Sequence, residues 1–167
     1  KLSFFQPLTI IELEAYHKIN RDLQKITKIQ AELSFQSGNY SAIKSAITSF
    51  LAEVLQKSLR QSESNEDLFI FLYNSIQNLH YSLETQCVNF HLFFLLKLSR
   101  FLGFKPQPII KKELKSIFFD LKEGYFVEKT PTHPHFLSGN QAKIFNAFIL
   151  STENSFSISR FERKELL

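Results

Sequence analysis

Cys87 and His91 stand four residues apart, a spacing that places two potential metal ligands on one face of a helix. A zinc site takes three or four ligands, and the sequence holds one Cys. His133 and His135 are two further candidates, but only a tertiary approach of distant segments would bring them to Cys87. We therefore interpret Cys87 and His91 as ordinary core or boundary residues and expect no metal.

Cys87 with a histidine could also form a nucleophile and its base. Nothing around Cys87 marks an activated thiolate, and most carboxylates stand beside lysines on expected surfaces. Four scattered glycines cannot build a glycine-rich phosphate loop. We expect a protein that is not an enzyme and needs no cofactor.

Basic residues gather in the second half of the chain. Residues 1–84 carry a net charge of −1, whereas residues 85–167 carry +5. Much of this excess consists of seven cations: Lys97, Arg100, Lys105, Lys111, Lys112, Lys115 and Lys122. Such a cluster attracts polyanions or acidic peptides. A solvated face is the alternative interpretation, because charge alone names no ligand.

The 19 Phe residues are an unusual excess. Aromatic side chains beside a basic groove can stack with the bases of single-stranded nucleic acid. Most of these Phe residues fall at helical core spacing, so we expect them to pack in the interior. Phe104 and Phe119, within the basic region, are the ones we expect to be exposed.

The 167 residues suffice for about one domain with a sizeable core. With 44% apolar and 22% charged residues, the chain is neither collagen-like, disordered nor a disulfide scaffold. A single Cys suits a reducing compartment. No signal segment opens the chain and no apolar run is long enough to span a membrane. We expect a cytoplasmic protein without membrane contact.

The first half of the chain predicts a strand and then helices. Apolar residues alternate over residues 8–16, which is typical of a strand. Residues 23–33 are ambiguous, because their apolar spacing also suits a helix. From Ser41 to Leu59 the period becomes 3.6, and Ser64-Asn-Glu-Asp67 resembles a capping box that opens a second helix.

The second half predicts a central helix and a small hairpin. Residues 89–102 are apolar nearly all round, which predicts a buried helix that ends at Gly103. Residues 104–137 hold four of the five prolines and form an irregular insertion, with a possible hairpin over 118–127 that turns near Gly124. Capping boxes at Ser138 and Ser159 predict two further helices.

Three blocks of the sequence resemble the RecO family of bacterial recombination mediators and DNA repair proteins. They are Phe50-Leu-Ala-Glu-Val-Leu-Gln-Lys-Ser-Leu-Arg60, Asn89-Phe-His-Leu-Phe-Phe-Leu-Leu-Lys-Leu-Ser-Arg-Phe-Leu-Gly-Phe104 and Ser159-Arg-Phe-Glu-Arg163. The opening Phe5-Gln-Pro-Leu8 and the strand after it look like the late strands of that family's OB-fold. No single block is catalytic or unique, but their order is fairly specific.

The resemblance implies a mainly α fold. On this basis residues 1–36 are the C-terminal remnant of an OB-fold β-barrel, as a short strand pair, and residues 37–167 are the helical domain of the RecO C-terminal type. The chain, which contains no Met, would then be a fragment that lacks most of the OB-fold. Many members of the family carry a four-cysteine zinc site after the central helix. Residues 105–131 contain no Cys, so they resemble the branch with a short strand pair in its place.

The resemblance also implies partners. RecO-like proteins bind single- and double-stranded DNA, anneal strands, join RecR and recognise the acidic C-terminal tail of single-stranded-DNA-binding protein. In this way they help RecA to load, and they catalyse no reaction. A structural helical adaptor without a DNA role is the alternative.

Two sets of cations are the predicted contact residues. An acidic tail that ends in Phe needs an apolar pocket with cations at its rim, which we assign to Lys97, Arg100 and Arg160. Arg100 can hold a carboxylate through two hydrogen bonds. Cations near a helix C-terminus also suit the helix dipole without any ligand. DNA phosphates would contact Lys105, Lys111, Lys112 and Lys115.

Overall fold

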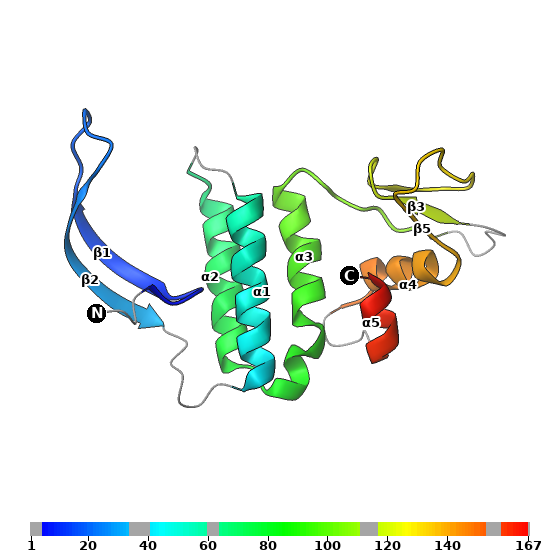
Figure 1. Ribbon diagram of the computed structural model, residues 1–167, viewed down its shortest axis with the longest axis horizontal. Coiled ribbons are helices and arrows are strands. Elements are labelled where there is room, and N and C mark those ends of the chain that lie inside the picture. Colours follow the sequence, from blue (N-terminus) through cyan, green and yellow to red (C-terminus); the bar gives the residue numbers. More distant parts are fainter. Residues whose placement is uncertain (1–4, 34–40, 60–63, 111–116, 153–157, 167) are drawn as a thin grey trace. The chain divides into compact units, whose positions relative to one another are not determined.

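The computed structural model describes residues 5–33, 41–59, 64–110, 117–152 and 158–166. The chain forms two compact units, Lys1–His91 and Leu92–Leu167, and each is described by itself. About half of the chain is helical and there are two small sheets (Figure 1), which is compatible with the expected mainly α fold. The predicted domain boundary between residues 36 and 37 lies outside the described residues, so it stays a prediction.

The first unit begins with a long β-ribbon. Strands β1 (Ile10–Tyr16) and β2 (Lys25–Leu33) pair antiparallel, so residues 25–33 are a strand and not the helix that their spacing also allowed. The register gives the ribbon an apolar face, where Leu13 lies opposite Ile29, and a polar face, where Glu14 lies opposite Lys28. Alternation of side chains along paired strands explains these two faces.

The tip of the ribbon is a closed loop. The Gln24 side chain accepts a hydrogen bond from the Lys18 N–H at 2.8 Å and donates to the carbonyls of Lys18 and Arg21 at 3.1 and 2.6 Å. A hollow of about 340 Å³ lies at this tip and is lined by Tyr16, Lys18, Arg21, Leu23, Gln24 and Lys25.

Two helices follow the ribbon. Helix α1 (Ala42–Ser58) begins at Ser41, whose Oγ accepts a hydrogen bond from the Lys44 N–H. Helix α2 (Glu66–Tyr81) begins one residue later than predicted, because Asn65 rather than Ser64 caps it through the Leu68 N–H. Lys44 Nζ donates to the His80 carbonyl at 2.8 Å, which joins the start of α1 to the end of α2.

A 3₁₀-helix, η2 (Glu84–Asn89), leads into helix α3 (Phe90–Phe101). The expectation that this helix is buried all round is wrong. Leu92, Phe93, Phe94 and Leu98 are buried, but Leu95 and Leu96 are half-buried and Phe101 is 38% exposed. The helix ends as predicted, because Gly103 takes the left-handed conformation with φ +86° and the Phe104 N–H bonds the Ser99 carbonyl at 2.8 Å.

The second unit places a small sheet on a helix. Strands β3 (Phe118–Asp120), β4 (Tyr125–Val127) and β5 (Phe136–Ser138) form an antiparallel sheet in the order β4-β3-β5. The first two strands are at the predicted hairpin, and β5 was not predicted. Helix α4 (Gly139–Leu150) packs against this sheet (Figure 1) through Phe145, whose ring centroid lies 4.6 Å from that of Phe119.

The predicted capping box at Ser138 does not form, since the Ser138 side chain makes no capping hydrogen bond among the described residues. Ser138 is the last residue of β5, and Gly139, with φ +53°, turns the chain directly into α4. The box at Ser159 does form. Its Oγ accepts from the Glu162 N–H and the Ser159 N–H donates to Glu162 Oε2, which opens helix α5 (Arg160–Leu166).

No helix in the described part of the chain is both long and apolar enough to cross a membrane.

Candidate functional site

An apolar groove lies between α3 and α4 in the second unit. One wall is a stripe at positions i, i+3, i+4 and i+7 of α3, and the other is the face of α4 that carries two phenylalanines. The lining residues are Leu92, Leu95, Leu96, Ser99, Pro106, Phe145 and Phe148. Its volume of about 200 Å³ is below the roughly 300–1,000 Å³ of sites for drug-sized molecules. The groove therefore suits one or two apolar side chains of a peptide.

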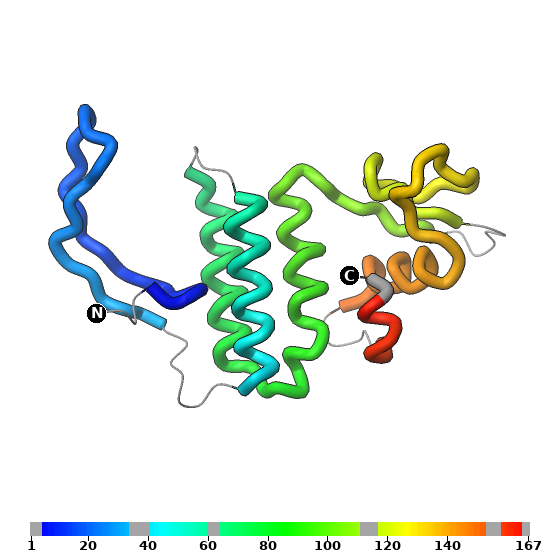
Figure 2. The backbone as a smooth tube through the Cα atoms, viewed as in Figure 1, coloured from blue at the N-terminus to red at the C-terminus, as the bar shows by residue number. Residues whose placement is uncertain are grey.

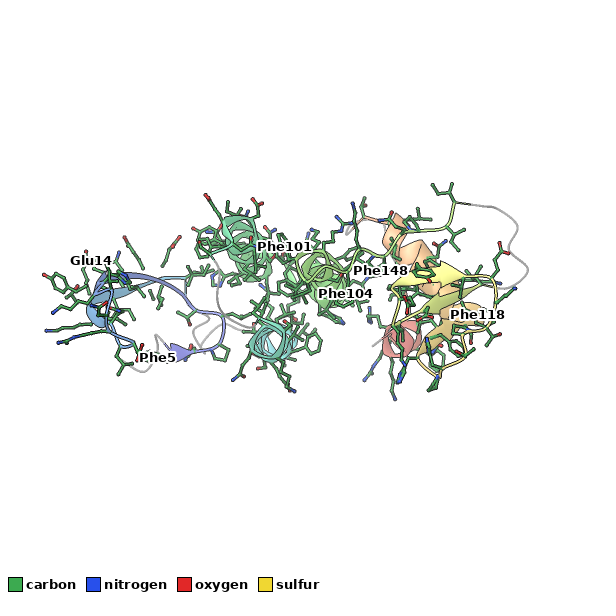
Figure 3. The ribbon with its side chains drawn as sticks, turned by 90° about the horizontal axis from the view of Figure 1, so that it is seen from above. Phe5, Glu14, Phe101, Phe104, Phe118 and Phe148 are labelled. Carbon is green, nitrogen blue, oxygen red and sulfur yellow. The ribbon has the colours of Figure 1, made fainter. Side chains whose placement is uncertain are left out.

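The floor of the groove is part of the hydrophobic core of the second unit. Leu92, Phe93 and Phe148 are buried together, and Ile158, just before α5, packs against them. The rings of Phe93 and Phe148 are 4.8 Å apart, and Phe148, labelled in Figure 3, lies on the side of α4 that faces α3. Well-packed aromatic pairs of this kind keep the groove walls at a fixed separation.

The segment that follows α3 closes one end of the groove. Residues 104–110 run as extended backbone (Figure 2). The Asn146 side chain on α4 holds this segment through two hydrogen bonds, accepting from the Ile109 N–H at 2.8 Å and donating to the Ile109 carbonyl at 3.1 Å. With Gly103 turning the chain at one end and Asn146 fixing it at the other, Pro106 is held against the groove.

Lys97 and Arg100, the predicted cations of α3, lie at different angles around the helix axis from the groove. Successive helical residues are about 100° apart, so Arg100 lies about 90° from the centre of the groove-lining stripe and Lys97 about 150°. Both side chains are exposed. Arg100 is thus at the rim, whereas Lys97 projects from nearly the opposite side of α3.

Two more predicted cations are close in sequence to residues of the groove or its floor. Lys105 is exposed and adjoins Pro106. Arg160 is exposed at the first position of α5, two residues after Ile158, which packs on the groove floor. Lys111, Lys112 and Lys115 lie outside the described residues, so their assignment to DNA stays a prediction.

The two phenylalanines expected at the surface have different outcomes. Phe104 is 55% exposed, as predicted. Phe119 is 3% exposed, so the prediction is wrong for it. Its position on the central strand of the sheet places its ring between Phe126, at 4.8 Å, and Phe145, at 4.6 Å.

Cys87 and His91 lie in the core and at its boundary, the positions expected of them. Cys87 is fully buried, its Sγ donates to the Leu83 carbonyl at 3.3 Å, and burial raises the pKa of the thiol. The ring of His91 packs edge-on against that of Phe50 on α1. A raised pKa disfavours the thiolate that a nucleophile needs.

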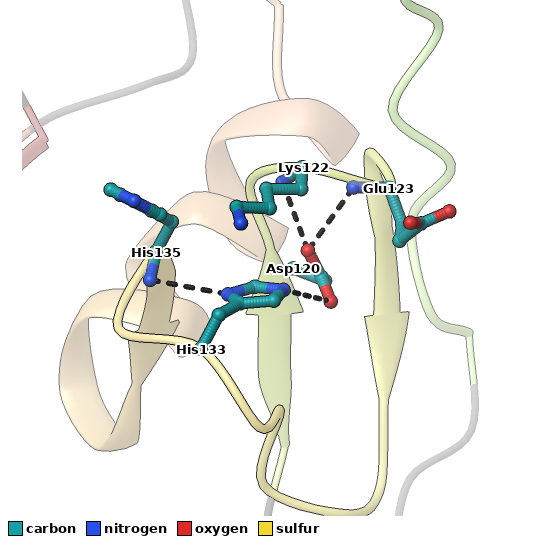
Figure 4. A network of polar contacts seen from close by, with 5 residues as sticks. All are labelled: Asp120, Lys122, Glu123, His133 and His135. Carbon is teal, nitrogen blue, oxygen red and sulfur yellow. Dashed lines mark hydrogen bonds and ion pairs between the residues drawn. The ribbon is translucent and has the colours of Figure 1, made fainter.

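A network of hydrogen bonds around Asp120 joins the turn after β3 to the loop that contains His133 and His135 (Figure 4). Asp120 is buried, and its Oδ1 accepts from the N–H groups of Lys122 and Glu123 at 2.9 and 3.1 Å. Its Oδ2 lies 3.1 Å from His133 Nε2, and His133 Nδ1 accepts from the His135 N–H. Burial by itself would raise the pKa of Asp120, but these hydrogen bonds and His133 together hold it below its ordinary value.

No three His, Cys, Asp or Glu residues of the described segments are grouped where they could hold a metal ion. His133 and His135 are used instead to tie their loop to the turn after β3. Arg100 at the rim was predicted from the sequence, but the α4 wall of the groove was not. The apolar period of α4 predicted a helix, yet no signal in one sequence says which helix it packs against.

The sequence is similar to known proteins over its whole length. A family model described as "Recombination protein O C terminal" matches residues 40–108. "DNA repair protein RecO" of Azobacteroides pseudotrichonymphae genomovar. CFP2 is 37% identical over 99% of this chain and 68% of its own. The proteins of that name from Phocaeicola vulgatus and Flavobacterium psychrophilum are 36% and 33% identical over 100% of this chain and 69% and 68% of theirs.

Proposed function

The chain belongs to the RecO family of DNA repair proteins, and on this premise we propose that its groove receives the C-terminal tail of single-stranded-DNA-binding protein. DNA repair and recombination is the function that family membership supports. The role of a mediator that brings coated single strands to RecA is the finer part of the proposal.

The apolar groove with cations around it is the observation that carries this proposal. A tail that ends in Phe would insert its ring between α3 and α4, where Leu96 and Phe145 line the groove. Its acidic residues would meet Arg100 at the rim, and Arg160, two residues after Ile158, is a second candidate contact. Apolar burial would supply most of the affinity, and the rim charges would select an acidic peptide.

The remaining partners are proposed from the family alone. They are RecR, single- and double-stranded DNA, and RecA indirectly. Lys105, Lys111, Lys112 and Lys115 are the proposed phosphate contacts in this half of the chain. No catalysed reaction is part of the proposal, in keeping with the burial of Cys87 and the raised pKa of its thiol.

The test is a titration of a fluorescent acidic peptide ending in Phe with this chain. We expect a dissociation constant on the order of 10 μM, about −7 kcal/mol. Ser99→Phe, which fills the groove from inside, should weaken binding at least about tenfold. The same peptide without its terminal Phe should not bind measurably. Equal affinity for both peptides would contradict the proposal.

A matched pair of charge reversals tests whether a cation at the rim of the groove contributes more to peptide binding than a cation elsewhere on α3. Arg100→Glu should weaken binding of the peptide more than Lys97→Glu does. Both variants reverse one positive charge on the same helix, but only Arg100 is at the groove. Equal losses would mean that the peptide senses net charge alone. A chain that binds the peptide but neither single- nor double-stranded DNA would favour the alternative, an adaptor without a DNA role.

A further inference from the structure

Asp120 joins the two neighbours of β3 in the small sheet of the second unit. Its Oδ1 accepts from two N–H groups of the turn toward β4, and its backbone carbonyl accepts from the Gly124 N–H at 2.8 Å. On the other side its Oδ2 meets His133 in the loop before β5, where the Leu121 N–H also donates to the His135 carbonyl at 3.1 Å. One buried carboxylate therefore fixes both the turn and the loop (Figure 4).

The hydrogen-bond partners of the His133 ring determine where its proton lies. Nδ1 accepts from the His135 N–H at 3.2 Å, and because a backbone N–H can only donate, Nδ1 carries no proton. The ring proton is then on Nε2, which donates it to Asp120 Oδ2 at 3.1 Å. An amide in place of this carboxylate would turn an N–H group toward either His133 or the N–H groups of the turn. It could therefore not keep both links.

Phe119, the residue before Asp120, extends to the other face of the sheet. Side chains alternate along a strand, so its ring points away from the carboxylate and toward α4. It lies opposite Phe126 of β4 in the register, with 4.8 Å between the ring centroids. Both rings lie beside Phe145 of α4, at 4.6 and 6.2 Å. Three aromatic rings thus form the contact between the sheet and α4.

Phe145 belongs to the sheet contact and to the groove at once. Its ring lines the groove, and it packs on the core that contains Phe93 and Phe148. The rings of Phe119 and Phe126 support it from the sheet. Because packed rings leave little free space, a shift of β3 or β4 displaces the rings next to it. The width of the groove at Phe145 therefore depends on where the sheet is held.

The sheet itself needs links of the kind that Asp120 makes. Each of its strands has three residues, so its backbone ladders are short, and small sheets are stable only with additional packing or contacts. The hydrogen bonds of Asp120 span all three strands, because they hold the connection to β4 and the connection to β5.

We propose that Asp120 and His133 are positioning residues of the groove. Their link holds the small sheet, and the sheet sets the Phe145 ring at the place where an apolar side chain of a bound peptide would lie. Neither residue lines the groove. The inference deepens the proposed function and rests on it for the identity of the ligand.

The first test is the affinity of the fluorescent acidic peptide for the Asp120→Asn variant of the full chain. We expect binding about five- to tenfold weaker, because Phe145 loses its fixed position. The direction is diagnostic, since removal of a negative charge would by itself strengthen binding of an acidic peptide. Glu128→Gln is the matched control, an exposed carboxylate just after β4, and should change the affinity less than about twofold.

A double-mutant cycle shows whether the loss acts through Phe145. In a Phe145→Leu background, Asp120→Asn should weaken binding less than about twofold, because the ring that it positions is absent. Equal losses in both backgrounds would overturn the inference.

Conservative replacement of His133 tests the link from its other end. His133→Ala should weaken the peptide as Asp120→Asn does. His133→Gln should bind within about twofold of the unchanged chain, because its amide can still donate to Asp120. Equal losses in the two histidine variants would contradict a role for this link.

The ring signals of Phe145 in NMR spectra provide a measurement without any ligand. Asp120→Asn should shift them and Glu128→Gln should not, with both variants folded by circular dichroism. If the unchanged chain bound no peptide but Asp120→Asn shifted these signals, the tail proposal would fail and the positioning of Phe145 would stand. If the peptide bound and Asp120→Asn changed neither the signals nor the affinity, the positioning inference would be wrong and the tail proposal would stand.

Discussion

The groove of the second unit and the hollow of the first differ in what lines them. The groove is lined by seven residues of which Ser99 alone carries a polar side chain, and its cations stand outside it. In the hollow at the ribbon tip, three cations and an amide are themselves part of the lining. Burial of apolar area would dominate affinity in the groove, whereas the charges of the hollow are open to screening by salt.

The two regions also differ in what keeps them in shape. The groove is the open side of a packed core, so its stability and its shape cannot be changed separately. The hollow is a loop on an exposed ribbon, closed by the hydrogen bonds of Gln24. A substitution in the packed floor of the groove, such as one at Phe148, therefore affects folding and binding together.

Phe148→Ala should have the largest effect on the free energy of unfolding. Phe148 is 3% exposed and its ring contacts that of Phe93, so the loss should be about 3–5 kcal/mol. Urea denaturation followed by circular dichroism measures it. Phe161→Ala, where the side chain is 71% exposed, is the control and should change stability by less than about 0.5 kcal/mol. Similar small losses in both would show that the groove floor is not a core.

Asn146→Ala should have the next largest effect, about 1–3 kcal/mol, because it removes both hydrogen bonds to Ile109 and leaves half-buried backbone groups unpaired. Hydrogen exchange of the Ile109 amide should accelerate more than that of amides in α1. The acidic peptide should also bind more weakly, since Pro106 is no longer held. Unchanged exchange at Ile109 would mean that the segment is fixed by packing alone.

Salt should weaken binding of DNA and of the acidic peptide to a different extent. Raising the monovalent salt from about 50 to about 200 mM should weaken binding of single-stranded DNA roughly 20-fold if three phosphates are neutralised. Binding of the acidic peptide should fall only a few-fold, because apolar burial does not depend on counterions. Equal salt dependence of the two ligands would mean that the peptide is held by charge and not by the apolar groove.

Acid should destabilise the second unit but not the ribbon tip, and this is the smallest of the four expected effects. The pKa of Asp120 is lowered in the folded protein, so its contribution to stability is present above the unfolded value of about 4. That contribution is lost as pH falls through the lower folded value. Thermal unfolding between about pH 6 and pH 3 should show a steeper loss for the unchanged chain than for Asp120→Asn. Parallel curves would contradict this assignment.

Much of the fold could be predicted from local pattern. The apolar period from Ser41 to Leu59 predicted α1, and Gly103 marked the end of α3. These features depend on residues near each other in sequence. The position of Phe119 failed because its burial depends on β5 and α4, which bring residues from beyond position 135 onto the strand.

The two regions could be predicted to different extents. Arg100 was predicted as a rim cation from the family resemblance and its place on α3, but Phe145 and Phe148 were not predicted as groove residues, because the pairing of α3 with α4 is a long-range contact. The hollow was not predicted, although Lys18, Arg21 and Lys25 lie within eight residues of one another, because the closure of the loop by Gln24 has no signal in the sequence. Counting charges over half the chain averaged them with acidic residues of β1 and the helices.

Gln24 has a consequence for how the ribbon tip responds to acid and salt. Its carboxamide has no proton to gain or lose between acid and alkaline pH and carries no charge for ions to screen. The hydrogen bonds of Gln24 are therefore neither titrated nor directly screened by salt.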